Sequence, residues 1–178
     1  MSSDTEAAPA VSLSHGIQLY LLIFVTVVAW VFISLRFFPT SAYAGFLLLW
    51  YWATVEKAAF HRLPASVIGA LVGAAMGWFA IYMTSKFGMP NGLILGVLPV
   101  AVALFVVIMN WLPLVFNGAT MLFVTVLGAP LLRSTNYPEF GGSVIVGALF
   151  FAAVVYAATI YVKMRSKAKN QTTSLHSA

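Results

Sequence analysis

Long apolar runs separated by short polar breaks occupy most of this chain, and they constrain its fold more than any other feature. A helix needs about 20 apolar residues to cross the roughly 30 Å hydrocarbon core of a bilayer. Only 7% of the 178 residues are charged, whereas a soluble domain has about a quarter, so most of the surface must face lipid. We therefore predict an all-α integral membrane protein with six transmembrane helices, at residues 17–38, 42–55, 66–84, 91–109, 118–132 and 142–162.

The second and fifth runs are shorter than the roughly 17 residues that a perpendicular span requires. A chain with five spans, or with a re-entrant segment, is therefore an alternative. In each case we expect residues 1–16 to form a disordered N-terminal tail, residues 17–162 a single transmembrane domain, and residues 163–178 a basic cytoplasmic tail.

The distribution of Lys and Arg predicts the orientation. With six spans, six of these residues lie on the side that carries both tails, and Arg36, Lys86 and Arg133 lie on the other. Cytoplasmic loops are enriched in Lys and Arg, so both termini are expected in the cytoplasm. The cations gather after the last apolar run, not in a patch interleaved with aromatic residues. We therefore expect the lipid bilayer, and no nucleic acid, as a partner.

The two halves of the chain, at about residues 17–86 and 91–162, resemble each other. Apolar runs of equal length end at Pro39 and at Pro113, and a later run in each half opens with Ser-Val-Ile, first at Ser66. A unit of three spans inserts its second copy upside down, and such a 3+3 inverted repeat usually places a solute path at the interface of its halves. The short second and fifth runs then point to that path.

Polar side chains in or beside the short runs are the candidate pore or substrate residues. An amide or hydroxyl at membrane depth is costly unless it bonds within the protein or faces water. Each could instead cap a helix or bond back to its own helix, and this alternative stays open. The candidates are Asn110, Asn117, Thr120, Thr125 and Thr54.

The end of the second run and the loop after it carry the candidate gate. Glu56 and His61 lie five residues apart, and a His side chain titrates near neutral pH. An interfacial loop with compensating charges is the alternative. Trp50 and Trp52 could form a hydrophobic constriction, although Trp also forms the anchoring belts of membrane interfaces.

No catalytic constellation is present. The chain has no Cys and only four acidic residues, of which Glu139 is assigned to the last loop. We therefore expect no enzyme activity, no cofactor and no metal site. Glycines at every fourth position let helices approach closely, which predicts either a tight bundle or a contact between copies in a homo-oligomer. These glycines are Gly69, Gly73, Gly77, Gly92 and Gly96.

Four short motifs resemble an uncharacterised family of small bacterial inner-membrane proteins with six spans and a domain of unknown function. They are Ala44-Gly45-Phe46-Leu47, Trp78-Phe79-Ala80-Ile81-Tyr82, Ile94-Leu95-Gly96 and Gly118-Ala119-Thr120. The resemblance covers roughly residues 17–161 and implies a bacterial cytoplasmic membrane and a six-helix fold. It supplies no substrate and no functional residues. The chain departs from the family at residues 56–62, where members often have a Gly-rich loop.

Taken together, these features favour a small-solute channel or facilitator for a neutral or weakly acidic molecule, acting as a homo-oligomer. Coupled transporters usually keep a carboxylate inside the membrane, and Glu56 is the only candidate for one. An ion-coupled secondary transporter is therefore the alternative. A membrane-embedded assembly or regulatory subunit is a second alternative, of a class that moves no solute.

Overall fold

The computed structural model describes residues 13–129 and 135–176, and its regular structure over them is entirely helical. A 3-10 turn at Phe60–Arg62 precedes the third helix. The predicted all-α class is confirmed, while the tail at residues 1–12 and Arg133 lie outside the described residues. The helices are α1 (Leu13–Phe37), α2 (Ala42–Thr54), α3 (Leu63–Phe87), α4 (Asn91–Ile108), α5 (Gly118–Leu127) and α6 (Tyr137–His176).

Two of the six helices are much shorter than the others. α2 has 13 residues and α5 has 10, which at 1.5 Å per residue gives about 20 Å and 15 Å. Neither length crosses a hydrocarbon core of roughly 30 Å as a perpendicular helix. Four segments are long and apolar enough to cross a membrane: Gly16–Phe37, Phe60–Phe87, Asn91–Ile108 and Tyr137–Met164.

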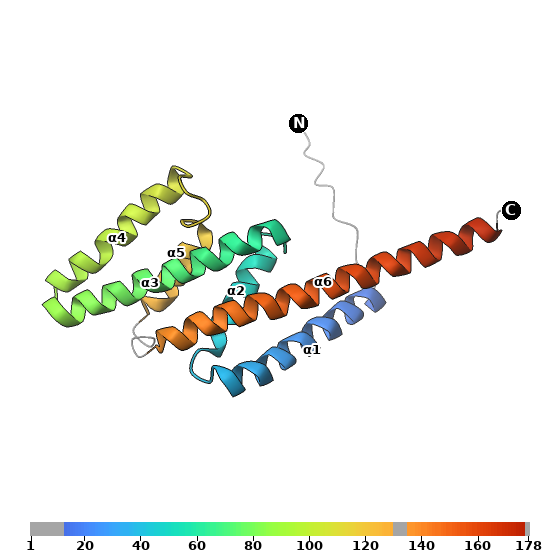
Figure 1. Cartoon of the computed structure of the whole chain (residues 1–178), viewed down its shortest axis with the longest axis horizontal. Helices are drawn as coiled ribbons and strands as arrows, with labels where there is room; N and C mark the ends of the chain where they lie inside the picture. The colour runs from blue at the N-terminus through green and yellow to red at the C-terminus, as the bar shows by residue number, and fades with distance from the viewer. Residues whose placement is uncertain (1–12, 130–134, 177–178) are drawn as a thin grey trace.

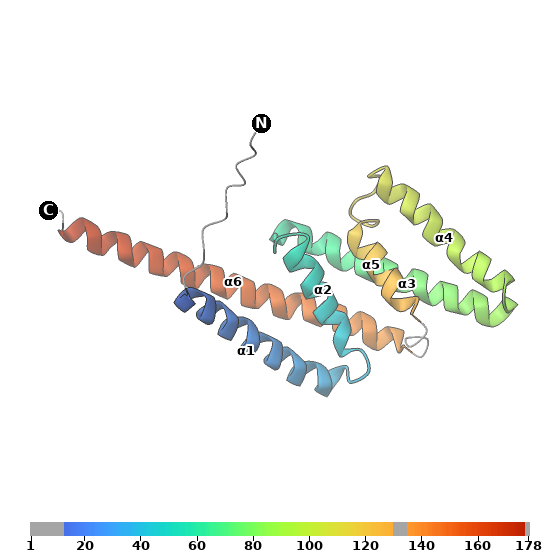
Figure 2. The same ribbon diagram turned by 180° about the vertical axis from the view of Figure 1, so that it is seen from behind.

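The helices are arranged around α3 and α6, which run antiparallel and overlap over part of their lengths (Figure 1). α4 lies along α3 toward one end of the molecule, and α1 lies along α6 toward the other. The short helices cross the same face of α3 and α6 (Figure 2). α2 packs mainly on α6, whereas α5 packs mainly on α3. Each short helix therefore rests on a long helix from the other half of the chain.

The core lies where α2, α3, α5 and α6 meet. Phe123 and Phe140 are fully buried, and their rings meet edge to face with centroids 5.8 Å apart. Leu48 approaches from α2 and is 1% exposed. Aromatic and aliphatic side chains therefore fill the centre of the molecule. The whole cluster comprises Ala44, Leu48, Ala70, Ala74, Phe123, Leu127, Phe140, Val144 and Ala148.

Glycines allow this close packing. A Cβ atom on Gly73 would lie 2.5 Å from the Thr120 carbonyl oxygen in α5, and one on Gly96 would lie 2.8 Å from the Cα of Ala80 in α3. No side chain fits at such distances. The predicted role of these glycines in a tight bundle is confirmed, and the contacts lie within one copy of the chain. The remaining predicted glycines also abut α5 or α3: Gly69, Gly77 and Gly92.

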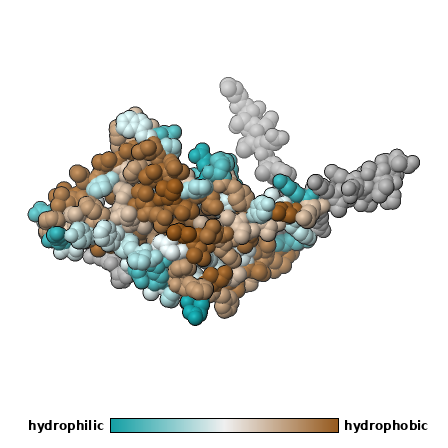
Figure 3. Space-filling model, in the orientation of Figure 1, coloured by the Kyte–Doolittle hydropathy of each residue, from teal (hydrophilic) through white to brown (hydrophobic). Residues whose placement is uncertain are grey.

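α1 and the end of α6 are the least enclosed parts of the fold. Trp30 anchors α1: it is 1% exposed, its Nε1 donates to the Ala42 carbonyl at 3.2 Å, and its ring lies 5.3 Å from that of Phe151. Many other side chains of α1 are apolar and exposed, and apolar residues cover most of the face in Figure 3. α6 continues to His176, so the expected separate tail from residue 163 begins inside this helix.

Candidate functional site

Asn117, a predicted pore residue, caps α5. Its Oδ1 accepts from the backbone N–H groups of Ala119 at 2.9 Å and Thr120 at 3.4 Å. Its Nδ2 donates to the carbonyl oxygen of Ala65 in α3 at 2.8 Å and to that of Pro113 at 3.1 Å. An amide that caps one helix and bonds to another satisfies groups which would otherwise be left unpaired. Asn117 therefore ties the start of α5 to the start of α3.

Thr120, a second predicted pore residue, completes the cap. Its hydroxyl accepts from the Asn117 backbone N–H at 3.2 Å and donates to the Val115 carbonyl at 2.9 Å. The side chain is fully buried. Asn117 and Thr120 thus form a reciprocal capping box, in which Thr takes the place of the usual Glu or Gln. The Thr120 hydroxyl therefore both donates and accepts a hydrogen bond within the protein.

The predicted gate residue Glu56 lies beside this cap. Its Oε1 accepts from the Tyr51 hydroxyl at 3.1 Å, and its Oε2 lies 3.8 Å from the Arg62 Nε. Tyr51 reaches the start of α5, because a Cβ atom on Gly118 would lie 2.8 Å from the Tyr51 hydroxyl oxygen. We call this group the α5 junction; it comprises Tyr51, Glu56, Arg62, Ala65 and Asn117.

The other gate candidates have separate positions. His61 is exposed. Trp50 is 51% exposed, as an interfacial anchor would be, whereas Trp52 is 1% exposed. The Trp52 Nε1 donates to the Ala59 carbonyl at 2.9 Å, which holds the loop after α2 against the bundle. The two Trp residues therefore do not form a shared constriction.

The remaining pore candidates are not brought together. The hydroxyls of Thr54 and Thr125 donate to backbone carbonyls four residues earlier in their own helices, at 2.6 Å and 2.7 Å. Both residues are exposed, and so is Asn110, which follows α4 with a φ of 53°. Asn and Asp are among the few residues that adopt this backbone region readily. The hydroxyls of Thr54 and Thr125 thus bond back to their own helices, the alternative left open by the sequence.

Glu139 is the residue that the sequence interpretation missed. It lies in the first turn of α6, not in a loop, and it reaches the start of α2. Its Oε1 accepts from the backbone N–H groups of Thr40 at 2.7 Å and Ser41 at 3.1 Å, and its Oε2 accepts from the Thr40 hydroxyl at 2.7 Å. The Asn136 Nδ2 donates to the same Oε2 at 3.3 Å. A carboxylate at a helix N-terminus is stabilised by these donors and by the helix dipole.

We call this second group the α2 junction; it comprises Thr40, Ser41, Asn136 and Glu139. The sequence contained a local signal for it, since Asn136 followed three residues later by Glu139 is a typical helix start. The Glu139 backbone N–H indeed donates to the Asn136 Oδ1 at 3.4 Å. Ser41 is fully buried, and within the described ranges 13–129 and 135–176 its hydroxyl has no hydrogen-bond partner. The contact with α2, about a hundred positions away in the chain, left no such signal.

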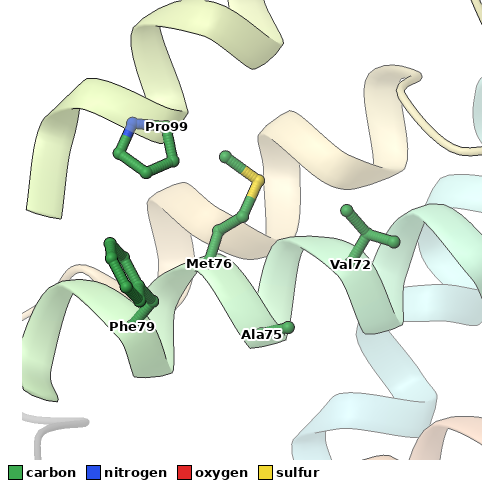
Figure 4. Close-up of a pocket in the computed structure, with 5 residues that line it drawn as sticks. All are labelled: Val72, Ala75, Met76, Phe79 and Pro99. Atoms are coloured by element: carbon green, nitrogen blue, oxygen red, sulfur yellow. The ribbon is translucent and has the colours of Figure 1, made fainter.

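An open cleft between α3 and α4 has a different character. It has a volume of about 340 Å³. Figure 4 shows Met76 and Phe79 of α3 on one side of it and Pro99 of α4 on the other. Its lining offers no hydrogen-bonding side chain, so it cannot recognise a polar solute.

Comparisons with protein-family models, with characterised proteins and with solved structures find no match to this chain.

Proposed function

We propose that this protein is a membrane facilitator for a small neutral or weakly acidic solute, built as a 3+3 inverted repeat and acting as a homo-oligomer. One observation carries the proposal: the N-terminus of each short helix is tied to the N-terminus of the third helix of the other half. Glu139 of α6 holds α2, and Asn117 of α5 holds α3. Interleaved halves with short central helices are typical of transport folds.

The packing supports the repeat. If residues 17–86 and 91–162 are equivalent, then α2 corresponds to α5 and α3 to α6. The packing of α2 on α6 then mirrors that of α5 on α3. The close contacts correspond too: Gly147 of α6 abuts the Gly45 Cα in α2, and Gly73 of α3 abuts the Thr120 carbonyl in α5.

The two junctions also agree with six crossings and with cytoplasmic termini. Six crossings place the loops that contain Glu56 and Asn117 on one side, and these loops meet at the α5 junction. They place the loop that contains Thr40 and the start of α6, which carries Glu139, on the other side, and these meet at the α2 junction. The positive-inside rule assigns the α5 junction, which carries Arg62, to the cytoplasm. The family resemblance implies a bacterial cytoplasmic membrane.

The lining between the junctions limits the solute. Apolar side chains such as Leu48 and Phe123 fill the space between the two polar ends. A charged solute would lose its hydration there without gaining a partner. A small neutral molecule, or a weak acid that crosses in its protonated form, loses much less. We place the path along the seam between the halves, where α2 packs on α6 and α5 packs on α3, closed in this structure.

Osmotic swelling of proteoliposomes tests the proposal. Stopped-flow light scattering follows vesicles shocked with urea, glycerol, formate, acetate or ammonium. We expect faster swelling with one of these solutes than in empty liposomes, and a rate changed several-fold by Tyr51→Phe. The matched control is Tyr82→Phe, because Tyr82 is 40% exposed on α3. Rates equal to those of empty liposomes for every solute contradict the facilitator and favour a carrier or a non-transport subunit.

An ion-coupled carrier is the second candidate, and Glu139 favours it. This carboxylate lies inside the segment Tyr137–Met164, which is of spanning length. Coupled carriers commonly use a carboxylate in this way. Uptake against a solute gradient, driven by an imposed pH or sodium gradient and lost in Glu139→Gln, would support the carrier. Passive swelling that persists unchanged in the same variant would support the facilitator.

A further inference from the structure

We propose that the contact between Glu139 and the α1–α2 loop is a latch that opens one end of the α2–α6 seam independently of the other end of the molecule. This inference rests on the proposed function, in which the seam between the halves is the solute path. Glu139 is here a positioning residue, because it acts through α2 and not on the solute. We name its contact with Thr40 and Ser41 the Glu139 latch.

The composition of the latch favours a contact that forms and breaks as a unit. Three of the four groups that donate to the Glu139 carboxylate belong to the consecutive residues Thr40 and Ser41. One movement of this loop therefore releases all three hydrogen bonds together. Glu139 and Thr40 are not enclosed in the core. Water can therefore replace the lost donors, and the carboxylate is not stranded unpaired when the latch opens.

The latch covers a dry seam. Directly beneath it Ser41 is fully buried. One turn further along α2, the Gly45 backbone N–H donates to the Ser143 hydroxyl at 3.2 Å. Below that level, Leu48 and Val144 belong to the apolar core. Release of the latch therefore exposes Ser41 first, and deeper opening requires the core itself to separate.

The opposite end has its own, chemically different tie. Asn117 joins α5 to α3 through a neutral amide, and beside it Ser66 is 1% exposed. No hydrogen bond or ion pair among the described residues joins Asn117 to Glu139, and the packed core lies between them. Two separable ties at opposite ends are the requirement for a path that opens at one end at a time.

The absence of cysteine allows a direct test. The variants S41C and S66C each introduce one thiol, at the α2 junction and at the α5 junction, in a serine that is buried. Purified protein in nanodiscs is reacted with a water-soluble maleimide, which reaches both faces of the disc. We expect both thiols to react slowly. Adding Glu139→Ala to S41C should accelerate its reaction by about tenfold or more, given the usual strength of hydrogen bonds to a carboxylate.

The S66C reporter decides between a local latch and general loosening. With Glu139→Ala we expect the reaction rate of the S66C thiol to change by no more than about twofold. With Asn117→Ala we expect the opposite result: the S66C thiol should react faster, and the rate of the S41C thiol should stay nearly unchanged. Equal acceleration of both thiols by Glu139→Ala, or no acceleration of S41C, overturns the latch. If Glu139→Ala does not fold, Thr40→Val removes a single donor and should produce a smaller change of the same kind. The labelling rates do not depend on solute movement, so this result stands apart from the swelling experiment.

Discussion

The two junctions have the same design and use different chemistry. Each ties the start of a short helix to the start of a long helix from the other half of the chain. The α2 junction does so with the Glu139 carboxylate, which only accepts hydrogen bonds. The α5 junction does so with the Asn117 amide, which caps its own helix and donates to the Ala65 carbonyl. A carboxylate can change its charge and an amide cannot, so the Glu139 tie can respond to ions and the Asn117 tie cannot.

The largest effect should come from glycines at equivalent packing positions. Gly147→Leu in α6 would press a side chain against the Gly45 Cα and Trp30, and Gly73→Leu in α3 would press one against the Thr120 carbonyl. Each should destabilise the bundle by about 3 kcal/mol, seen as a lower Tm in detergent. Gly16→Leu is the control, because a Cβ atom there has no neighbour within 4 Å. Damage from only one of the first two would break the correspondence between the halves.

The next largest effect should distinguish the charged Glu139 from the neutral Asn117. Asn117→Ala should cost about 1 kcal/mol of stability, as the loss of a helix cap usually does, at any ionic strength. Glu139→Ala should also lower the Tm. Because salt screens exposed charges, the difference in Tm between wild type and Glu139→Ala should shrink between 50 mM and 1 M NaCl. An equal salt response in Asn117→Ala would show that charge does not distinguish the junctions.

Two tyrosines sharpen the comparison further. The Tyr51 hydroxyl donates to Glu56 at the α5 junction, whereas the buried Tyr137 hydroxyl near the α2 junction has no hydrogen-bond partner among the residues that the structure describes. Tyr51→Phe should therefore destabilise the protein by about 1 kcal/mol, while Tyr137→Phe should be neutral or stabilising. Thermal unfolding of both variants measures the difference. A cost at Tyr137 equal to that at Tyr51 would mean that its hydroxyl has a partner.

The smallest effect is expected at the ion pair of the α5 junction. The Arg62 side chain is 54% exposed, and its Nε lies 3.8 Å from the Glu56 carboxylate. Exposed pairs of this kind contribute about 0–1 kcal/mol. Arg62→Gln should therefore leave the Tm nearly unchanged. A large loss of stability would show that Arg62 makes a contribution beyond this pair.

Local patterns in the sequence were sufficient to predict where most of the helices lie. The starts of α2 at Ala42, α4 at Asn91 and α5 at Gly118 agree with the predicted runs, because a turn or a cap precedes each of them. The end of α6 does not, since the apolar run stops near residue 162 while the helix continues to His176. Lys and Ala are good helix formers, so loss of hydrophobicity does not end a helix.

Local sequence patterns could not predict the contacts that form the two junctions. Asn117 was singled out correctly as an amide that needs a partner, but its partner, Ala65, is 52 positions away. Glu139 was assigned to a loop because three of the four groups that donate to its carboxylate belong to Thr40 and Ser41, about a hundred positions earlier in the chain. A single sequence shows that a polar residue in an apolar run needs a hydrogen-bond partner. It does not reveal which distant residue forms the hydrogen bond with that polar group.

The unbroken length of α6 has a mechanical consequence. Glu139 lies in its first turn, and the same 40-residue helix ends at His176, about 60 Å away at 1.5 Å per residue. A continuous helix bends only gently, so α6 behaves as a lever with the α2 junction on its short arm. A small tilt applied to the far arm, outside the bundle, is transmitted along the rod to the carboxylate that holds α2.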